Sequence, residues 1–352
     1  MDGGTPAIGL ESILRQHARD TRDFGIGDHV QSRDFSIDSM SFLREFISTS
    51  RPLLVKEERT VQHLWHARDR WLDDEYLLSK AGDVEVTIAL TPDGLADCPH
   101  DGLFALPCSK RVPLRVFFEL LLHQAGDGPV AYLQQQNSSL TAELPVLLDD
   151  VEIKIEWAEE AFGNEPEAIN LWIGRKPSKT SWHRDHFENI YVVVRGCKIV
   201  RLLPPTESYR MQLKRYPVAT YEEDGRGGLA LNRNRDDNEV VLWSSIMPCT
   251  CLDDASRISE GVRCSSCMKL YQAGLEPLEV RVCAGDVLYI PACWWHEIHH
   301  GPIADISQGL DETTIVVNYW YDMMHDVKFS SMLLVDRLAE ELRLNESPCN
   351  SD

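Results

Sequence analysis

The sequence contains no apolar run of the ~20 residues that a membrane helix requires, and it has no excess of basic residues. Lys and Arg number 35 against 56 Asp and Glu, which gives a formal net charge of -21. A chain with this balance is not expected to bind nucleic acid through its overall field, although it would attract basic peptides. Acidity of this kind is also common simply because it favours solubility.

The segment after the first Met has no apolar core, so we expect no secretory signal. The ten cysteines are therefore expected to be reduced thiols or metal ligands rather than disulfides, in a cytoplasmic or nuclear protein. The 352 residues, of which 43% are hydrophobic, suffice for one large domain or two ordinary ones. No internal repeat interrupts this chain.

Changes in composition along the chain predict three parts. Residues 1–36 form an N-terminal extension, residues 37–325 the main domain, and residues 326–352 a C-terminal helix and tail. An insertion at about 222–277 divides the main domain. Its charged first part, Glu222–Asn238, contains three glycines and predicts a surface loop.

Helical spacing of apolar residues and helix-start signals predict four helices. They are expected around Ile8–Ala18, after an Asp38 N-cap, after Pro113, and over Val327–Leu344. The last one carries an apolar stripe at Met332, Leu333, Val335, Leu338 and Leu342. Such a stripe either packs on the core or pairs with a second copy of the chain.

Short apolar or alternating segments separated by turn residues predict strands. They are Leu53–Val55, Val84–Leu90, Val130–Gln136, Ala168–Gly174, Asn189–Val194, Lys198–Leu203, Leu278–Val282, Val287–Pro291 and Thr314–Tyr321. Many short strands without intervening helices are typical of a β-sandwich or barrel.

The segment Thr180–Asp185 contains an H-x-D triplet, His183 and Asp185. In a strand, residues i and i+2 share a face, so both side chains would bind one metal ion. His296, after a strand and a tight turn, is the best third ligand. Two His and one carboxylate form the ligand set of non-haem iron(II) oxygenases, which leaves positions open for a cosubstrate and O2. A lone H-x-D also occurs by chance.

Lys198 lies inside an otherwise apolar strand, where a buried ammonium is costly unless it meets an anion. A dicarboxylate cosubstrate would supply that anion. Further donors to its carboxylates are Thr180, Asn189, Tyr132 and Asn318. For Tyr132 and Asn318 an ordinary role as hydrogen-bonding core residues stays open.

The pattern of His183, Asp185, Asn189, Lys198 and Trp294–His296 resembles that of JmjC hydroxylases. Further segments resemble the JmjC domain-containing protein 7 family over about residues 40–335. They are Val86–Gly94, Tyr132–Gln136, Leu140 with Glu143–Pro145, His186–Tyr191 and Asn318–Met323.

That resemblance implies a mainly β protein with flanking helices, built on a distorted double-stranded β-helix, the cupin-like jelly roll. It implies an oxygenase using Fe(II), 2-oxoglutarate and O2, with His183, Asp185 and His296 on the iron. Lys198 would pair with 2-oxoglutarate, assisted by Thr180, Asn189, Tyr132 and Asn318. The implied activity is (3S)-hydroxylation of lysine in GTP-binding proteins, and the family is expected to form a homodimer.

Three other functions stay open: histone lysine demethylation, peptidase activity and non-catalytic binding by a cupin-like module. The same iron chemistry would serve demethylation. Glu188, Asp93 and Glu143 offer carboxylates to a free ammonium, whereas Trp182 with Trp294–Trp295 offer aromatic faces to a methylated one. Intact metal and cosubstrate residues argue against the binding module.

His296–His300 matches H-E-x-x-H, a zinc-protease motif that needs a helix. Pro291 lies just before it and Gly301–Pro302 just after. A helix of adequate length does not fit between them, so we do not expect a zinc-protease site.

Four cysteines of the insertion, Cys249, Cys251, Cys264 and Cys267, have a spacing that suits a structural zinc site. The alternative is a solvent-exposed loop with free thiols. The cluster departs from the family pattern, and we expect it near the mouth of the cavity, where it would influence substrate choice.

Overall fold

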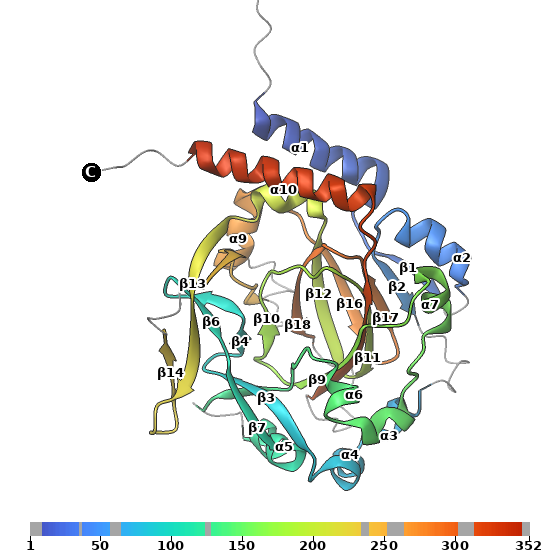
Figure 1. Ribbon diagram of the computed structural model, residues 1–352, viewed down its shortest axis with the longest axis vertical. Coiled ribbons are helices and arrows are strands. Elements are labelled where there is room, and N and C mark those ends of the chain that lie inside the picture. The colour runs from blue at the N-terminus through green and yellow to red at the C-terminus, as the bar shows by residue number, and fades with distance from the viewer. Residues whose placement is uncertain are drawn as a thin grey trace, which may run out of the picture.

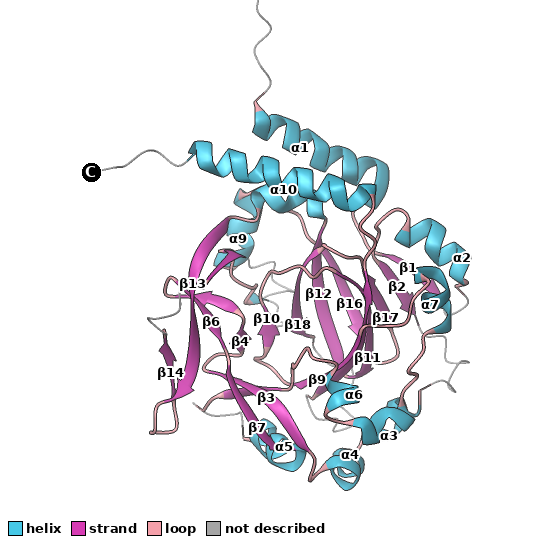
Figure 2. Ribbon diagram, in the orientation of Figure 1, coloured by secondary structure: helices cyan, strands magenta, loops and turns pink. Residues whose placement is uncertain are grey.

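Strands form the centre of the molecule and most helices lie at its periphery (Figure 2). The structure is a computed structural model of the chain. It describes residues 9–34, 37–56, 65–123, 128–233, 239–251, 264–301 and 313–346. None of the described helices is long and apolar enough to cross a membrane.

Two sheets form the core of the fold. The larger contains, in spatial order, β1 (Gln31–Asp34), β2 (Leu53–Lys56), β17 (Val287–Ile290), β11 (Phe187–Arg195), β19 (Thr314–Asp322) and β9 (Ala168–Gly174). The smaller contains β16 (Leu278–Cys283), β12 (Cys197–Leu203) and β18 (Trp295–His300). The predicted mainly β, cupin-like fold with flanking helices is thereby confirmed.

The two sheets face each other across an apolar layer. Val193 and Val316 reach this layer from the larger sheet, and Val200, Leu202 and Val280 from the smaller one. Because side chains alternate along a strand, Lys198 points into the layer with Val200 and Leu202. Ile199 and Arg201 point to the opposite face of β12. Lys198 is therefore a charged residue on the inward face of the strand, where its neighbours Val200 and Leu202 are apolar.

Further strands extend the molecule beside this core (Figure 1). One sheet contains β7 (Cys108–Pro113), β3 (Glu85–Thr91) and β8 (Val130–Tyr132). A second contains β14 (Leu229–Asn232), β13 (Leu213–Glu223), β6 (Leu103–Leu106) and β5 (Cys98–His100), with β15 (Val240–Ser244) also paired to β13. β4 (Leu95–Ala96) pairs with β10 (Lys179–Thr180).

One strand prediction and one loop prediction need correction. The strand expected over Val130–Gln136 ends at Tyr132, followed by an isolated bridge between Leu133 and Ile173. Glu222–Asn238 is not simply a loop, because β13 and β14 pair from Thr220 to Asn232 across a turn. Residues 234–238 lie outside the described residues. Hydrogen bonding to a neighbouring strand overrides the charged, glycine-containing composition of this segment.

The helices cover the outside of the sheets (Figure 2). They are α1 (Leu10–Thr21), η1 (Arg22–Ile26), α2 (Ser39–Phe42), η2 (Leu43–Ile47), α3 (His66–Arg70), α4 (Asp74–Ala81), α5 (Leu114–Leu122), α6 (Ser139–Ala142), η3 (Pro145–Asp150), α7 (Glu156–Phe162), η4 (Pro205–Arg210), α9 (Ser265–Gln272) and α10 (Val327–Glu346). The four predicted helices are confirmed. At the start of α2 the Asp38 side chain accepts a hydrogen bond from the Ser41 amide at 2.8 Å.

The apolar stripe of α10 packs within the chain. α10 contacts η4 and lies beside α1 (Figure 1). Val335 is buried, and Leu338 and Leu342 are half-buried, whereas Leu333 is exposed and does not belong to the packed face. Of the two arrangements expected for this stripe, packing on the core is therefore the one observed.

Candidate active site

His183, Asp185 and His296 converge on one point. All three ligand atoms lie within 4.8 Å of one another. Asp185 Oδ2 is 3.9 Å from His183 Nε2 and 3.6 Å from His296 Nε2. A hydrogen bond at Nδ1 orients each imidazole ring. Nδ1 of His183 bonds to the Ser181 carbonyl, and Nδ1 of His296 bonds to the Trp294 carbonyl. Each Nδ1–H donates, so each Nε2 is left as a ligand atom.

The H-x-D segment is not a regular strand, contrary to prediction. His183 instead forms an isolated bridge with His296 of β18, with mutual backbone hydrogen bonds of 3.1 and 2.8 Å. The Cys293 amide donates to the Asp185 carbonyl at 2.8 Å. The turn before β18 thus fixes all three side chains. Burial, followed by the neighbouring His183, lowers the pKa of His296 to about 4, which keeps its imidazole neutral as a metal ligand requires.

Lys198 is an enclosed cation. It is 2% exposed, and its Nζ lies 2.9 Å from His300 Nε2 and 5.4 Å from the centre of the Tyr132 ring. Both partners are neutral, because burial holds the pKa of the His300 imidazole well below its usual value and raises the pKa of the Tyr132 phenol. Burial also lowers the pKa of Lys198 to about 7. Within the described contacts this ammonium therefore has no counter-charge.

The other predicted residues surround the same small cavity as the metal-ligand set. Its lining includes Tyr132, Thr180, Asn189 and Asn318. Asn318 is held in place, since its Oδ1 accepts from Trp172 Nε1 at 2.7 Å and its Nδ2 donates to Asn189 Oδ1 at 3.2 Å. Thr180 Oγ1 accepts from the Ile298 amide at 3.0 Å. The structure thus brings these four residues around the cavity of the metal-ligand set, and Lys198 lies next to it beside Tyr132.

These residues fit Fe(II) and 2-oxoglutarate. Two imidazoles and one carboxylate leave coordination positions open. A buried ammonium without a counter-charge is costly, and a dicarboxylate that enters the cavity offsets that cost. The fit therefore rests on the donor set and on the uncompensated charge of Lys198.

Comparison with known protein families shows to which family this chain belongs. A family model described as a cupin-like domain matches residues 39–327. The lysine-specific demethylase JMJ32 of Arabidopsis thaliana is 35% identical over 315 residues, 89% of this chain and 87% of that protein. This chain belongs to the JmjC family of cupin-like proteins.

Two further relatives have JmjC names. The bifunctional peptidase and (3S)-lysyl hydroxylase JMJD7 of Homo sapiens is 32% identical over 94% of this chain and 96% of its own. JmjC domain-containing protein E of Dictyostelium discoideum is 30% identical over 91% of both chains. The chain is thus a JmjC oxygenase, and this family generally uses Fe(II) and 2-oxoglutarate.

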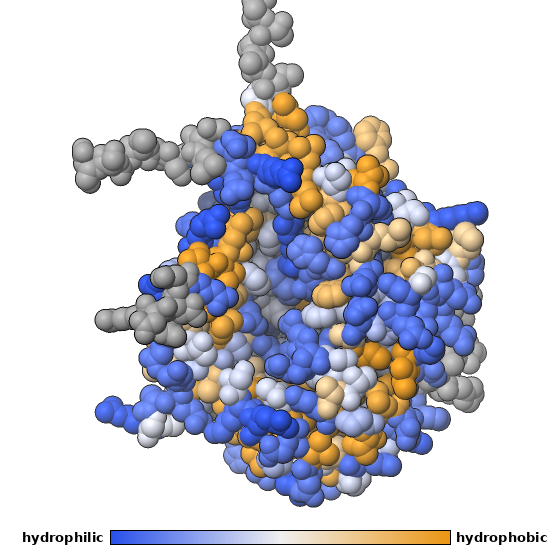
Figure 3. Space-filling view, viewed as in Figure 1, coloured by the Kyte–Doolittle hydropathy of each residue, from blue (hydrophilic) through white to orange (hydrophobic). Residues whose placement is uncertain are grey.

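A cleft of about 870 Å³ opens onto the metal site of the JmjC domain. Figure 3 shows a hollow near the middle of this face. The lining comes from β6, β10, β13 and β15, together with the segment after β8. Because His183 and Asp185 are part of the lining, a side chain that enters the cleft reaches the metal-ligand set.

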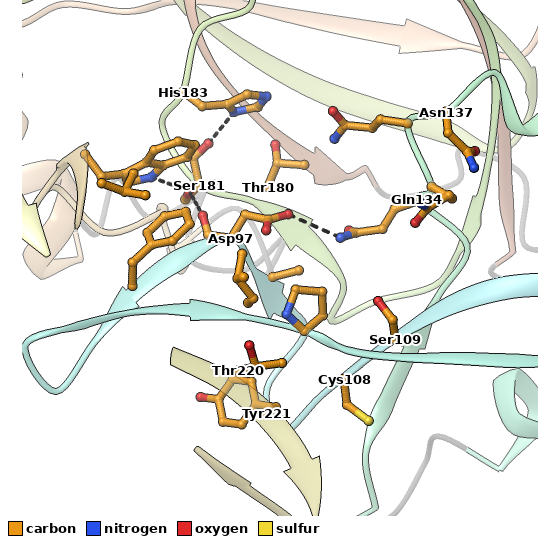
Figure 4. Close-up of a pocket in the computed structure, with 18 of the residues that line it drawn as sticks. Asp97, Cys108, Ser109, Gln134, Asn137, Thr180, Ser181, His183, Thr220 and Tyr221 are labelled. Carbon is orange, nitrogen blue, oxygen red and sulfur yellow. Dashed lines mark hydrogen bonds between the residues drawn. The ribbon is translucent and has the colours of Figure 1, made fainter. Parts of the chain in front are cut away.

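Asp97 is the acidic side chain that sequence reasoning missed. It lies between β4 and β5 and lines the cleft, and Figure 4 shows it beside Thr180, with Gln134 on its other side. Gln134 Nε2 donates to its carboxylate at 3.4 Å, and Ser181 Oγ to its carbonyl at 2.8 Å. Burial raises the pKa of Asp97, which His183 partly opposes. A carboxylate in such surroundings favours a cationic partner.

The carboxylates expected near the substrate have other partners. Glu188 accepts from the Tyr289 hydroxyl at 2.7 Å and from the Ala292 amide at 3.0 Å. Glu143 accepts from the amide and the hydroxyl of Thr87, both at 2.7 Å. Asp93 accepts from the Leu95 amide at 3.0 Å. These three are turn and core residues, and none of them is part of the cleft lining.

Trp182, Trp294 and Trp295 are at most 5% exposed and belong to apolar clusters. Their interpretation as core residues is therefore confirmed. The aromatic residues in the cleft are others, including Phe104, Tyr221 and Trp243. The ring of Trp243 is parallel to that of His183, with 6.2 Å between centres.

The H-E-x-x-H segment forms strand β18, as its flanking residues required. His296 and His300 share one face of that strand, whereas Glu297 points to the other. His296 belongs to the metal-ligand set and His300 to the surroundings of Lys198. A helical zinc-protease arrangement is absent from this described segment.

The four insertion cysteines also come together, with their Sγ atoms within 4.8 Å of one another. They pack against Ile199 on the outward face of β12. The expectation that they lie at the cavity mouth is wrong, because β13 and β15 of the insertion line the cleft and the cysteines do not.

Proposed function

We propose that this JmjC oxygenase hydroxylates a lysine side chain of a protein or peptide. Bound Fe(II) and 2-oxoglutarate supply the chemistry: with O2 they convert a C–H bond into C–OH and give succinate and CO2. His183, Asp185 and His296 would hold the iron, and the buried ammonium of Lys198 would pair with a carboxylate of 2-oxoglutarate. Thr180, Asn189, Tyr132 and Asn318 orient the cosubstrate in the cavity.

The observation that carries the choice of lysine is Asp97 in the cleft. A substrate lysine that presents a carbon of its stem to the iron must place its ammonium on a hydrogen-bond acceptor. Asp97 and Glu222 line this cleft, while the cation Arg184 is occupied by Asp336 at 2.7 Å. The acidic surroundings therefore favour a free ammonium group and a basic peptide segment.

Histone lysine demethylation is the second candidate. Phe104, Tyr221 and Trp243 lie in the same cleft, and aromatic faces favour methylated ammonium groups. The relative that is 35% identical is named a lysine-specific demethylase. We favour hydroxylation because Asp97 is among the acids that line the cleft and its described hydrogen bond, from a neutral amide, leaves its charge uncompensated.

The deciding experiment is mass spectrometry of lysine peptides after incubation with Fe(II), ascorbate and 2-oxoglutarate. We expect a gain of one oxygen on unmethylated lysine and no formaldehyde. Loss of a methyl group from a methylated histone peptide, abolished in His183→Ala, would replace hydroxylation by demethylation.

Asp97→Asn tests the anchor itself. Because a hydrogen bond to a charged group contributes ~1.5–3 kcal/mol, we expect kcat/KM for the lysine peptide to fall about 10- to 100-fold. The KM for 2-oxoglutarate should stay unchanged. Asp101→Asn is the matched control, since Asp101 is exposed at the next turn. Equal kinetics of the two variants would exclude Asp97 as the ammonium partner.

Three further expectations stay proposals. The resemblance to the JmjC domain-containing protein 7 family extends the substrate to GTP-binding proteins. A homodimer is proposed on the same basis, and a cytoplasmic or nuclear location on the expected lack of a secretory signal. Peptidase activity is part of the human relative's name, but the strand conformation of His296–His300 argues against the zinc-protease arrangement here.

A further inference from the structure

Four thiols meet on the side of the small sheet that faces away from the proposed iron site. They come from two segments of the insertion, Cys249–Cys251 and Cys264–Cys267, and the second lies at the start of α9. The first two are buried and the other two half-buried. None of them lines the catalytic cleft or the small cavity, so the oxygenase reaction gives them no role.

The sulfur atoms are arranged as around one metal ion. The Sγ atom of Cys249 lies 3.0 Å from that of Cys251 and 3.2 Å from that of Cys267. The Sγ atoms of Cys251 and Cys264 are 3.7 Å apart. Zinc bound at ~2.3 Å by four thiolates sets sulfur atoms about 3.8 Å apart. A disulfide would need about 2.05 Å and would leave the sulfurs in pairs.

The local backbone suits thiolate ligands. Cys264 is the N-cap of α9, and its Sγ accepts from the Cys267 amide at 3.5 Å. Cys264 and Cys267 are three residues apart at the first turn, so both side chains point the same way. Amides that point at Cys264 Sγ stabilise negative charge on sulfur, as a metal thiolate requires.

The cluster is attached to the strand that carries His296. The Cys249 amide donates to Glu297 Oε2 at 3.3 Å, and Glu297 Oε1 accepts from Arg201 Nη1 at 2.6 Å. Glu297 is completely buried and directly follows His296 in β18. On β12, Ile199 packs against the cysteines. Its neighbour Lys198 points to the opposite face. The insertion thus covers the back of both strands that supply the proposed iron and 2-oxoglutarate residues.

We propose that Cys249, Cys251, Cys264 and Cys267 bind one structural zinc ion, which fixes the insertion on the back of β18 and so holds the strand that carries His296. The ion exchanges no electrons. Its binding releases the thiol protons and joins two segments of the insertion that both pack against Ile199.

Elemental analysis tests the metal. The purified protein should contain about one zinc per chain. Cys264→Ser should reduce it to near zero, while Cys108→Ser, a half-buried cysteine outside the cluster, should leave it unchanged. Asp185→Ala should also keep its zinc, which separates this site from the iron site. Absence of zinc from the unaltered protein, or equal zinc in Cys264→Ser and Cys108→Ser, would overturn the proposal.

Two measurements cover the case in which Cys264→Ser does not fold. A mercurial titration of the unaltered protein should release the zinc as four thiols react. Cobalt(II) in place of zinc should give the intense absorption of tetrahedral thiolate coordination. Release of zinc before any thiol reacts, or a cobalt spectrum without thiolate bands, would overturn the site.

Hydrogen exchange tests the link to β18, with no iron present. Amides of Trp295–His300 should exchange faster in Cys264→Ser, or after zinc release, than in Cys108→Ser. Amides of β9, which does not contact the cluster, serve as the internal reference. Unchanged exchange in β18 on loss of zinc would overturn the link.

Discussion

Lys198→Met should strengthen the fold and abolish the function of the cosubstrate site. Met fills a similar volume without a charge, and His300 keeps a hydrogen bond to Ser178 at 3.0 Å. Burial lowers the pKa of Lys198 from 10.5 to about 7 in the folded chain. At ~1.36 kcal/mol per pKa unit, the buried ammonium costs about 5 kcal/mol at neutral pH and below.

The pH dependence of that cost has a definite sign. Below pH 7 both the folded and the unfolded chain hold the proton, and the cost is complete. Between pH 7 and 10.5 the unfolded chain still binds the proton that the folded chain has lost. The free energy of unfolding of the unaltered protein should therefore rise, relative to Lys198→Met, by about 1.4 kcal/mol per pH unit. The free energy of unfolding of Lys198→Met should exceed that of the unaltered protein most at pH 6.5, and the difference should shrink towards pH 9.

Denaturant unfolding between pH 6.5 and 9 measures this difference, without 2-oxoglutarate. Lys214→Met, at an exposed position, is the control and should show neither effect. A Lys198→Met protein that is less stable than the unaltered one at pH 6.5 would refute the reasoning, because the ammonium would then have an internal counter-charge.

The same charge should govern cosubstrate binding. With Mn(II) at the metal site to prevent turnover, we expect Lys198→Met to bind 2-oxoglutarate at least ~30-fold more weakly, since the lost partner of a buried pair contributes ~2–5 kcal/mol. In the unaltered protein, binding at pH 8 should take up a proton, because the dicarboxylate favours the ammonium form. Calorimetry in two buffers of different ionisation enthalpy detects that uptake, and its absence would show that Lys198 is not the anchor.

The remaining predictions concern the metal-ligand set and the last helix. His183→Ala or Asp185→Ala should abolish turnover with added iron and leave the circular dichroism spectrum unchanged; full activity of either would contradict the assignment. Leu338→Glu should lower the free energy of unfolding by about 2 kcal/mol because Leu338 is half-buried on α10, the helix that contacts η4. Leu334→Glu, 57% exposed on the same helix, should change it by less than ~0.5 kcal/mol. Light scattering at micromolar concentration tests the proposed homodimer, which a monomeric mass would contradict.

Local sequence patterns were sufficient where a residue and its neighbours decide the conformation. Ala168–Gly174 and Thr314–Tyr321 are apolar enough to be strands in any half-buried setting, and Asp38 is a strong N-cap. The metal-ligand set was also predictable, because its three residue types have a chemistry that few other arrangements share. Its backbone was not, since the bridge between His183 and His296 joins segments far apart in the sequence.

Other features depend on contacts that no local pattern reveals. β18 contains Glu297 and two His besides His296. Because of these polar residues its sequence does not predict a strand, although the strand is buried on both faces. Glu297 is accommodated there because Arg201 of β12 pairs with it at 2.6 Å and the Cys249 amide donates to it at 3.3 Å. Asp97 has no distinctive neighbours in the sequence, and its place in the cleft follows from the pairing of β4 with β10.

The segment between β12 and β16, which includes the insertion, contains both a wall of the cleft and the cysteine cluster, and these lie in different places. Residues of β13 and β15 face the substrate space, whereas the cysteines lie behind the strand that carries His296. Exchange of Leu213–Ser244 would therefore change one wall of the cleft without changing the metal-ligand set or Asp97. We expect a chimera that exchanges this segment with that of another JmjC protein to keep the residues of the proposed iron and 2-oxoglutarate sites and to present a different cleft wall to the proposed substrate.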